Sequence, residues 1–321
     1  MQILVFGLLC FVWGFSWVAI KLTLEGFPPF LGAGLRFLLA VPLLAGYAVW
    51  RGVPIRLPFS VVKIVFVTAV LTYAFDYGLI YWAEQHLSAG VTAILFATFP
   101  IFTGLFSRWL LPGERLGFGV FVGLLLGFLG VFVTYSDGLR VAASGEALTA
   151  ATAAVVVGAA GGALATVLIK RDLGGLHPVS LTLWQMIFGS SGLIAFAVLV
   201  DDPPGAVPGW PALFGLLYLG VVASALAFTL YYWLLAHSRA VSVSTMIFVT
   251  PVVALIGDSI VFGGDITPRI VAGMLLVFGG IGVTEFPRYR GHFRRLRSRS
   301  NEKMQGSKSI WRGRNGGASQ R

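Results

Sequence analysis

Charged residues are scarce in this chain. Asp, Glu, Lys and Arg make up 11% of its 321 residues, whereas an ordinary soluble domain has roughly a quarter. Hydrophobic residues make up 57%, and apolar runs of about 18 residues or more, each long enough to cross a bilayer as a helix, recur along the chain. A soluble fold could not bury so much apolar surface, so the sequence predicts an all-α integral membrane protein.

Cysteine is nearly absent, since Cys10 is the only one. A single thiol excludes an intramolecular disulfide and suggests neither a thiolate metal site nor a redox pair. The four histidines are scattered, and the chain contains no GxSxG, HExxH, P-loop or GxGxxG sequence. We therefore predict no cofactor, no metal and no catalytic residues, with an intramembrane enzyme as a minor alternative.

The net positive charge is confined to the C-terminal end, because Lys and Arg balance Asp and Glu over residues 1–286. The formal net charge is +10, and residues 287–321 carry 11 Lys and Arg against the single acid Glu302. This tail is rich in Arg and then in Gly and Ser, so it cannot form a core, and we predict that it is disordered and attracted to anionic membrane lipid. The tail has neither a folded nucleic-acid-binding domain nor aromatic residues interleaved with its basic ones, so nucleic acid is not an expected partner.

Polar, glycine-containing and proline-containing breaks divide the remaining chain into ten predicted spans. Ten spans put both termini on one side of the membrane, and the short loops on that side carry eight Lys and Arg against three on the other. The positive-inside rule therefore predicts cytoplasmic termini in a cell (plasma) membrane. The predicted spans are 3–20, 29–50, 61–83, 89–110, 117–135, 147–169, 178–200, 211–235, 241–262 and 268–286.

An internal duplication is the strongest organisational signal. Each copy contains five spans, an odd number, so the second copy must enter the membrane with the opposite orientation. We therefore predict two inverted-topology five-helix repeats, at residues 1–136 and 147–286, followed by the tail. At an offset of 151, Tyr81, Trp82, His86, Ala89 and Pro100 recur as Tyr232, Trp233, His237, Ala240 and Pro251. At an offset of 150, Gly123, Gly130 and Thr134 recur as Gly273, Gly280 and Thr284.

The segment of residues 81–116, with Pro100 in mid-helix, resembles the EamA branch of the drug/metabolite transporter superfamily. The resemblance covers residues 3–286. It implies ten helices, cytoplasmic termini, a central cavity between the two halves and transport driven by an ion gradient, as is typical of inverted-repeat secondary transporters. The other residues that carry it are Leu110–Leu116, Pro251, Gly264, Asp265 in place of the usual Glu, and Trp13–Trp17 followed by Lys21.

Two ionisable side chains are predicted to lie within the membrane. Arg36 is about a third of the way into the second span, and Asp76 is near the middle of the third. A charged group at this depth costs roughly 2.5–3.5 kcal/mol on insertion scales, so each is a functional hypothesis. Either the two form a salt bridge, or Asp76 binds a proton or a cationic substrate and Arg36 binds a carboxylate. Tyr73, Asp76, Tyr77 and Ile80 share one helical face, which is predicted to line a cavity.

Aromatic side chains extend this predicted site. Trp13 and Trp17 form an i, i+4 pair in the first span, and Trp184 and Gln185 lie in the seventh. Aromatic walls with a few polar groups suit amphipathic organic solutes, although packing alone explains each residue as well. Weaker candidates of the same kind are Tyr231, Ser224 and Thr245.

Prolines in mid-span predict bent helices. Pro100 and Pro251 occupy equivalent positions in the fourth and ninth spans, where a missing N–H kinks a helix either for gating or for fixed curvature. Asp258, near the outer end of the ninth span, is a candidate for gating or proton access unless it snorkels to the interface. A stripe of small residues in the fifth span permits close packing within the monomer or in a homodimer. The stripe consists of Gly119, Gly123 and Gly127.

The predicted function is secondary transport of a small organic metabolite, such as an amino acid, a related metabolite or a drug-like solute. Alternating access at the central cavity, export and proton coupling through Asp76 are expected. An uncoupled facilitator and a lipid scramblase-like protein are the alternatives. The expected partners are the small-molecule solute and membrane lipid.

Overall fold

The computed structural model describes residues 1–114, 117–141, 146–202, 207–253 and 268–284. These residues form helices joined by short turns, and no strand occurs among them. Asp258 and the tail at 287–321 lie outside the described residues. The prediction of an all-α protein is confirmed for the part of the chain that the structure describes.

Seven helices in the described residues are long and apolar enough to cross a membrane, and three shorter apolar helices accompany them. Two of the seven change to the wider π-helical winding for a few residues and then continue as α-helices, and a third ends in this winding. The prediction of a membrane protein with many spans is therefore confirmed, whereas the count of ten spans and the two-repeat arrangement stay predictions.

The long helices are α1 (Gln2–Leu24), α2 (Pro29–Arg51), α3 (Phe59–Ala69) with η1 (Val70–Asp76) and α4 (Tyr77–Ala83), α5 (Ala89–Phe96) with α6 (Phe99–Leu110), α8 (Glu146–Leu168) with η2 (Ile169–Leu173), α9 (Pro178–Val200), and α10 (Trp210–Gly220) with η3 (Val221–Leu226) and α11 (Ala227–His237). The shorter apolar helices are Phe118–Thr134 within α7 (Phe118–Val141), Ala240–Val253, which begins with α12 (Ala240–Ser244), and Pro268–Thr284.

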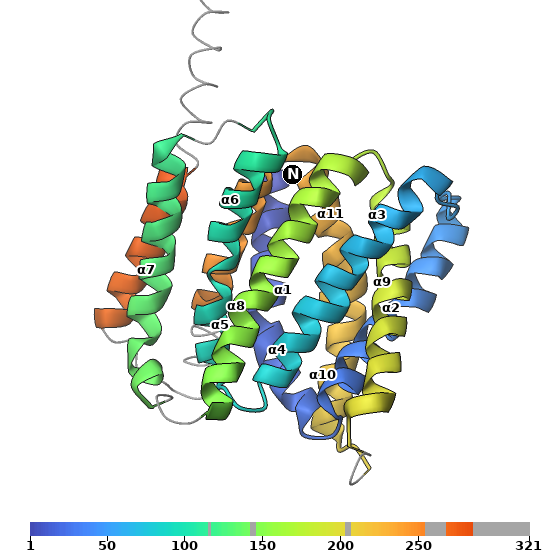
Figure 1. Ribbon diagram of the computed structural model, residues 1–321, viewed down its shortest axis with the longest axis horizontal. Helices are drawn as coiled ribbons and strands as arrows, with labels where there is room; N and C mark the ends of the chain where they lie inside the picture. Colours follow the sequence, from blue (N-terminus) through green and yellow to red (C-terminus); the bar gives the residue numbers. More distant parts are fainter. Residues whose placement is uncertain (115–116, 142–145, 203–206, 254–267, 285–321) are drawn as a thin grey trace, which may run out of the picture.

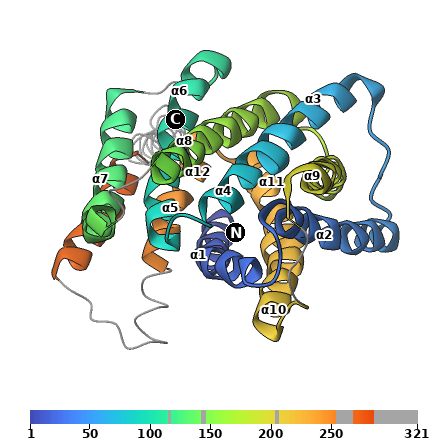
Figure 2. The same ribbon diagram turned by 60° about the horizontal axis from the view of Figure 1, so that its bottom comes forward.

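The helices stand side by side as one bundle (Figures 1 and 2). The pair formed by α7 and the Pro268–Thr284 helix lies at one edge, and α2 and α9 pack together toward the other (Figure 1). Both α2 and α9 begin at a proline, because the missing N–H costs no hydrogen bond at the first helical position. The long helices that surround the cavity lie between these two edges.

Glycines let α7 and the Pro268–Thr284 helix touch backbone to backbone. A Cβ atom at Gly123 would lie 2.6 Å from the carbonyl oxygen of Gly280, and one at Gly130 would lie 2.6 Å from that of Gly273. Gly123 and Gly130 are the repeat counterparts of Gly273 and Gly280, so the two contacts are reciprocal. Such reciprocity is what a twofold axis between two equivalent elements produces.

The stripe of small residues on α7 packs within the monomer at two of its three positions. Gly123 meets the Pro268–Thr284 helix, and a Cβ at Gly127 would lie 2.6 Å from the ring of Phe248. A Cβ at Gly119 would meet no atom within 4 Å. Packing inside the chain therefore accounts for Gly123 and Gly127, and a homodimer stays a prediction.

Two lysines each join the end of one long helix to the end of another. The ammonium of Lys21, near the end of α1, donates hydrogen bonds to the backbone carbonyls of Glu84 and Leu87 after α4. The ammonium of Lys170, at the end of the α8 span, donates to the carbonyls of Leu235 and Ala236 at the end of α11, at 2.8 and 3.1 Å. The last carbonyls of a helix have no partner within the helix, so each lysine caps a helix end and ties two helices together.

Glu114, in the turn after α6, caps a helix of the second half of the chain. Its two carboxylate oxygens accept hydrogen bonds from the backbone N–H of Ala240, at 3.0 and 3.2 Å, and so cap the start of α12. Partial burial raises the pKa of Glu114, against the lowering effects of this hydrogen bond and of the charges on Arg239 and Lys170. The turn after α6 is thereby attached to a helix of the second half.

Candidate functional site

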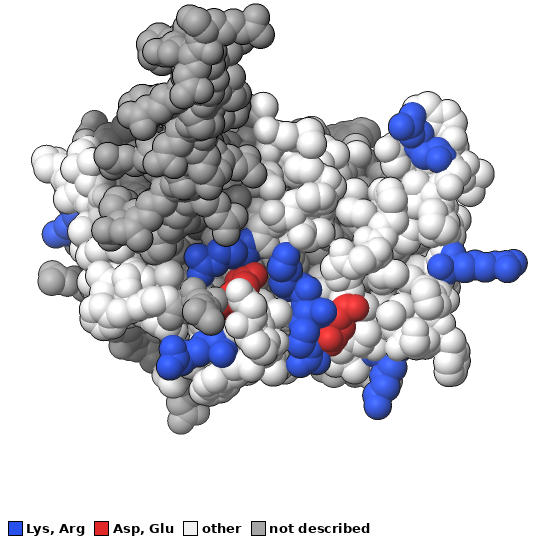
Figure 3. Space-filling view, turned by 90° about the horizontal axis from the view of Figure 1, so that it is seen from above, with Lys and Arg blue, Asp and Glu red and all other residues white. Residues whose placement is uncertain are grey.

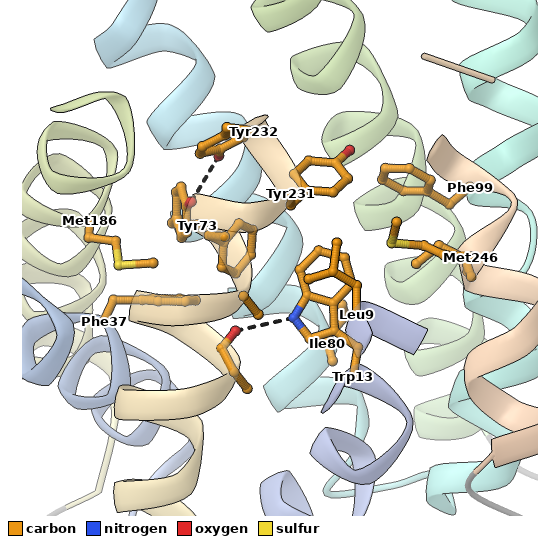
Figure 4. Close-up of a cluster of buried hydrophobic side chains, with 14 of the residues drawn as sticks. Leu9, Trp13, Phe37, Tyr73, Ile80, Phe99, Met186, Tyr231, Tyr232 and Met246 are labelled. Carbon is orange, nitrogen blue, oxygen red and sulfur yellow. Dashed lines mark hydrogen bonds between the residues drawn. The ribbon is translucent and has the colours of Figure 1, made fainter. Parts of the chain in front are cut away.

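A cavity lies inside the bundle, where α1, the segment of η1 and α4, α8 and α11 face one another. Residues of α5, α6 and the Ala240–Val253 helix complete its wall. It contains about 740 Å³ of space free of protein atoms, a volume that includes the open solvent at its mouth. Figure 4 shows aromatic side chains from several helices, among them Trp13, Tyr231 and Phe99, gathered at this place.

Asp76 supplies a carboxyl group to the cavity wall. It ends η1 and is only 2% exposed, and its Oδ1 atom is buried without a hydrogen-bond partner. Burying an unpaired charge is costly. A carboxyl group in this position is therefore stabilised when it binds a proton or the cationic group of a solute, which is the chemistry predicted for Asp76.

Two glycines of α8 leave the space that the Asp76 carboxyl group occupies. A Cβ atom at Gly158 would lie 3.0 Å from Oδ1 of Asp76, and a Cβ at Gly162 would overlap with Oδ2. The two glycines are four residues apart and so lie on one face of the helix. Any larger residue at Gly162 would force the carboxyl group out of its present position in the cavity wall.

If Asp76 has the coupling role predicted for it, Gly162→Ala is expected to reduce transport by between about 10- and 100-fold while the protein stays folded, because the added methyl group displaces the Asp76 carboxyl group by a fraction of its own length. Solute flux into proteoliposomes and thermal unfolding in detergent measure the two properties. Gly192→Ala is the control, since its Cβ would make only an ordinary contact, 3.6 Å from Ala74. Equal flux in Gly162→Ala and Gly192→Ala would contradict the role given to this packing.

Tyr77 and Ile80 line the cavity as predicted, but Tyr73 does not. Thr72 takes its place in the wall. The prediction assumed 3.6 residues per turn, whereas residues 70–76 form the π-helix η1, which is wound more widely. The wider winding rotates Tyr73 away from the face that Asp76 and Tyr77 share.

Tyr73 belongs instead to a buried hydrogen-bond chain behind the cavity. Its hydroxyl lies 2.8 Å from that of Tyr232, a cavity residue (Figure 4). The Tyr232 hydroxyl donates to Oε1 of Gln185 at 3.0 Å, and Nε2 of Gln185 donates to the hydroxyl of Thr68 at 2.8 Å. Gln185 is therefore not in the wall but holds Tyr232 in place.

The two tryptophans of α1 are in the cavity wall. Nε1 of Trp13 donates to the backbone carbonyl of Ala223 in η3 at 3.1 Å (Figure 4). Trp17 packs edge to face on Phe96 with ring centroids 5.7 Å apart. Both indole rings contact neighbours from other helices, so they form a rigid aromatic part of the cavity wall.

Arg36 is buried near the cavity but is not part of its wall. It is 1% exposed, its Nε donates to the hydroxyl of Ser224 at 3.1 Å, and Nη1 and Nη2 have no partner. Its guanidinium carbon lies 5.0 Å from the ring centroid of Tyr77, and no ion pair joins Arg36 to Asp76. The salt-bridge alternative is therefore absent from this conformation, and the ring of Tyr77 stands between Arg36 and the cavity.

Other predicted residues lie outside the wall. Nε1 of Trp184 donates to the carbonyl of Ile55 at 2.6 Å, which ties α9 to the loop before α3. Pro100 follows a break between α5 and α6, as expected for a helix-kinking residue, and Pro251 is buried within the Ala240–Val253 helix. The binding role of Trp184, the gating role of both prolines and all roles of Asp258 stay predictions.

Several wall residues were not singled out from the sequence. Thr166 of α8 pairs with the hydroxyl of Tyr231 at 2.9 Å, and Phe228 and Met246 add apolar surface. Helices that are apolar all round have no amphipathic period to show which face meets a cavity. Only their tertiary arrangement reveals these residues.

The EamA-like transporter family matches this chain over residues 1–136 and 149–286. The chain belongs to this family. The uncharacterized transporter YoaV of Bacillus subtilis is 26% identical over 276 residues, which are 86% of this chain and 93% of that protein. The uncharacterized inner membrane transporter YedA of Escherichia coli K12 is 27% identical over 280 residues, 85% of this chain and 87% of its own. The names of these EamA relatives describe transporters and not enzymes.

The fold of this EamA protein also occurs among solved structures. A crystal structure superposes with a TM-score of 0.75 and 17% sequence identity, covering 89% of this chain and 97% of the other. At this identity the likeness concerns the fold alone. It extends over nearly the whole of both chains, so the bundle around the cavity is a fold that another protein adopts in a crystal.

Proposed function

We propose that this EamA protein is a secondary transporter that exports a small organic metabolite by alternating access, coupled to protons through Asp76. The observation that carries the proposal is Asp76 itself, an acid without a partner at Oδ1 in the wall of an aromatic cavity in mid-span. The carboxyl group can bind a proton and a cationic solute group in competition, and such competition couples the two movements. The aromatic wall suits amphipathic solutes such as amino acids and related metabolites.

An inverted repeat of five plus five helices fits the contacts between the halves. The reciprocal pairs of Gly123 with Gly280 and of Gly130 with Gly273 support a twofold axis in the bundle. The π-helices η1 and η3 begin at Val70 and Val221, which are separated by the repeat offset of 151. Two halves with equivalent local structure around one cavity are what alternating access requires.

The distribution of charge favours cytoplasmic termini. Figure 3 shows Lys and Arg side chains gathered on the end of the molecule at which the N-terminus lies in Figure 1. By the positive-inside rule this end faces the cytoplasm. The other end, near Lys21 and Glu84, then faces outward, and below we call it the outer end.

The test is proton movement in proteoliposomes that contain the purified protein and a pH-sensitive dye, on addition of pools of amino acids and related metabolites. We expect at least one pool to trigger proton flux that protein-free liposomes do not show, and splitting that pool names the solute. Flux of a labelled solute without protons would leave an uncoupled facilitator, and dye-labelled lipid crossing the bilayer without solute flux would leave a scramblase. Either result would overturn the proposed coupling.

A further inference from the structure

Glu84 is a second buried acid, which the proposed mechanism does not use. It directly follows the span Phe59–Ala83 and is 0% exposed. Its Oε1 and Oε2 atoms are both buried without a hydrogen-bond partner. An ionised carboxylate is hardly ever found in this state, since it would lose its hydration and gain nothing in exchange.

The neighbouring cation does not satisfy this carboxyl group. Lys21 directs its hydrogen bonds to the backbone carbonyls of Glu84 and Leu87 and not to the side chain of Glu84. Among the described residues, Lys21 of α1 and Tyr81 of α4 are the charged or titratable groups that face it. The hydroxyl of Tyr81 is also buried without a hydrogen-bond partner, and Arg36 of α2 is a charged group close to that hydroxyl.

Lys21 and Glu84 stand at the outer end of the cavity. Trp17 and Ile80 line it, and Lys21 and Glu84 each follow one of them by four residues, about one helical turn of 5.4 Å. The contact between Lys21 and the turn after α4 therefore holds α1 and α4 together just beyond the cavity. Separating these two helix ends would open the cavity on this side.

The opposite end has the same lysine contact without a counterpart of Glu84. Lys170 follows the cavity residue Ile169 and binds the carbonyls of Leu235 and Ala236. At the repeat offset of 151 the counterpart of Glu84 is Leu235. The two ends thus share a lysine clamp, but the acid near Lys170, Glu114, is hydrogen-bonded to the backbone N–H of Ala240. In the outer clamp both carboxyl oxygens of Glu84 lack a partner.

We propose that Glu84 is a proton-binding site whose occupancy closes the outer end of the cavity. Protonated Glu84 is neutral and tolerates burial beneath the Lys21 clamp, whereas ionised Glu84 draws water and separates α1 from the turn after α4. The proton comes from water on the outer side and returns to it when the clamp opens. The inference rests on the proposed function only in taking the cavity as the transport pathway.

The direction of the pH dependence follows from burial. In the closed conformation burial raises the pKa of Glu84 from 4.5 to about 8, although the positive charge of Lys21 lowers it. In an open, hydrated conformation the ordinary value applies. Proton binding therefore stabilises the closed over the open conformation fully at a pH below the ordinary pKa. This stabilisation is lost as the pH rises through the higher pKa of the closed conformation.

The experiment measures access to the cavity directly. In full-length protein with Cys10→Ser, reconstituted in nanodiscs, Ile20→Cys places a thiol at the outer end of the cavity and reacts with a polar maleimide. Each labelling rate is divided by the rate of Val207→Cys at the same pH, which corrects for ionisation of the thiol. Val207 is 93% exposed, so its thiol is always accessible to the reagent. We expect the corrected Ile20→Cys rate to rise at least about tenfold from pH 5 to pH 9.

Two matched controls separate Glu84 from other groups. In the background of Glu84→Gln, the corrected labelling rate of Ile20→Cys should stay low at every pH. The same holds for Glu84→Leu, which introduces the residue found at the counterpart position, Leu235. Ile169→Cys, beside the lysine clamp that lacks a counterpart of Glu84, should show no such rise, because the nearby Glu114 carboxylate is hydrogen-bonded to Ala240. A rise that persists without Glu84, or no rise in its presence, overturns the proposal. Because labelling needs no solute, a pH-dependent rate without solute flux would refute the proposed function and leave this site standing.

Discussion

Asp76→Asn is expected to lower solute-driven proton flux in proteoliposomes to the level of protein-free liposomes. Asparagine keeps the shape of the side chain beside Gly158 and Gly162 but cannot bind and release a proton. The unfolding temperature should not fall, because an acid buried without a partner at Oδ1 contributes no favourable pairing that the amide would lose. Lost coupling with unchanged stability would assign the effect to chemistry and not to folding.

Asp172→Asn is the matched control for this substitution. Asp172 pairs with Arg171 at 2.8 Å in a half-exposed ion pair at the end of the α8 span, and such pairs contribute little to stability. Its removal should leave flux and stability unchanged. If Asp76→Asn retains full proton flux, Asp76 is not the coupling residue, and Glu84 becomes the next group to examine by the same assay.

The membrane character of the chain and its family could be predicted because their signals are global. The apolar composition and the paired motifs involve dozens of residues, so no single misplaced helix changes the conclusion. Asp76 was predicted for a related reason: an acid in mid-span is so costly that its presence there needs an explanation. The structure places Asp76, Tyr77, Trp13 and Trp17 in one cavity wall.

The orientation of individual side chains could not be predicted in the same way. Tyr73 does not lie on the predicted cavity face because η1 is a π-helix. Nothing in the sequence of residues 70–76 distinguishes this winding from the α-helix. The possible pairing of Arg36 with Asp76 was based on charge alone, whereas in the structure Arg36 donates to the hydroxyl of Ser224 and lies over the ring of Tyr77. Both departures depend on tertiary packing, which overrides local periodicity.

Glu84 escaped notice for the opposite reason. It follows the predicted third span, where a charged residue is ordinary, so the sequence does not single it out. Only the packing of α1 against the turn after α4 buries it and leaves both of its oxygen atoms without partners. A residue at the end of a predicted span can therefore lie as deep in the protein as one in its middle.

Gly123→Ala is expected to destabilise the protein by about 1–3 kcal/mol, as overpacking does. The new Cβ would lie 2.6 Å from the carbonyl oxygen of Gly280 and 2.7 Å from the backbone nitrogen of Thr284. Backbone atoms cannot rotate away, so α7 and the Pro268–Thr284 helix must separate along their length. Thermal unfolding in one detergent measures the loss.

Gly119→Ala and Gly280→Ala show whether the contact itself is responsible. Gly119 is one turn away on α7, and a Cβ there meets no atom within 4 Å, so alanine should be neutral or stabilising through its higher helix propensity. Gly280→Ala adds its methyl group from the other side and should cost as much as Gly123→Ala. The double substitution of Gly123 and Gly280 by alanine should lower the free energy of unfolding by less than the sum of the two single effects. Once one methyl group has separated the helices, the second has room. Fully additive losses, or equal losses in Gly119→Ala, would mean that these glycines act through their own helices and not through the contact between the halves.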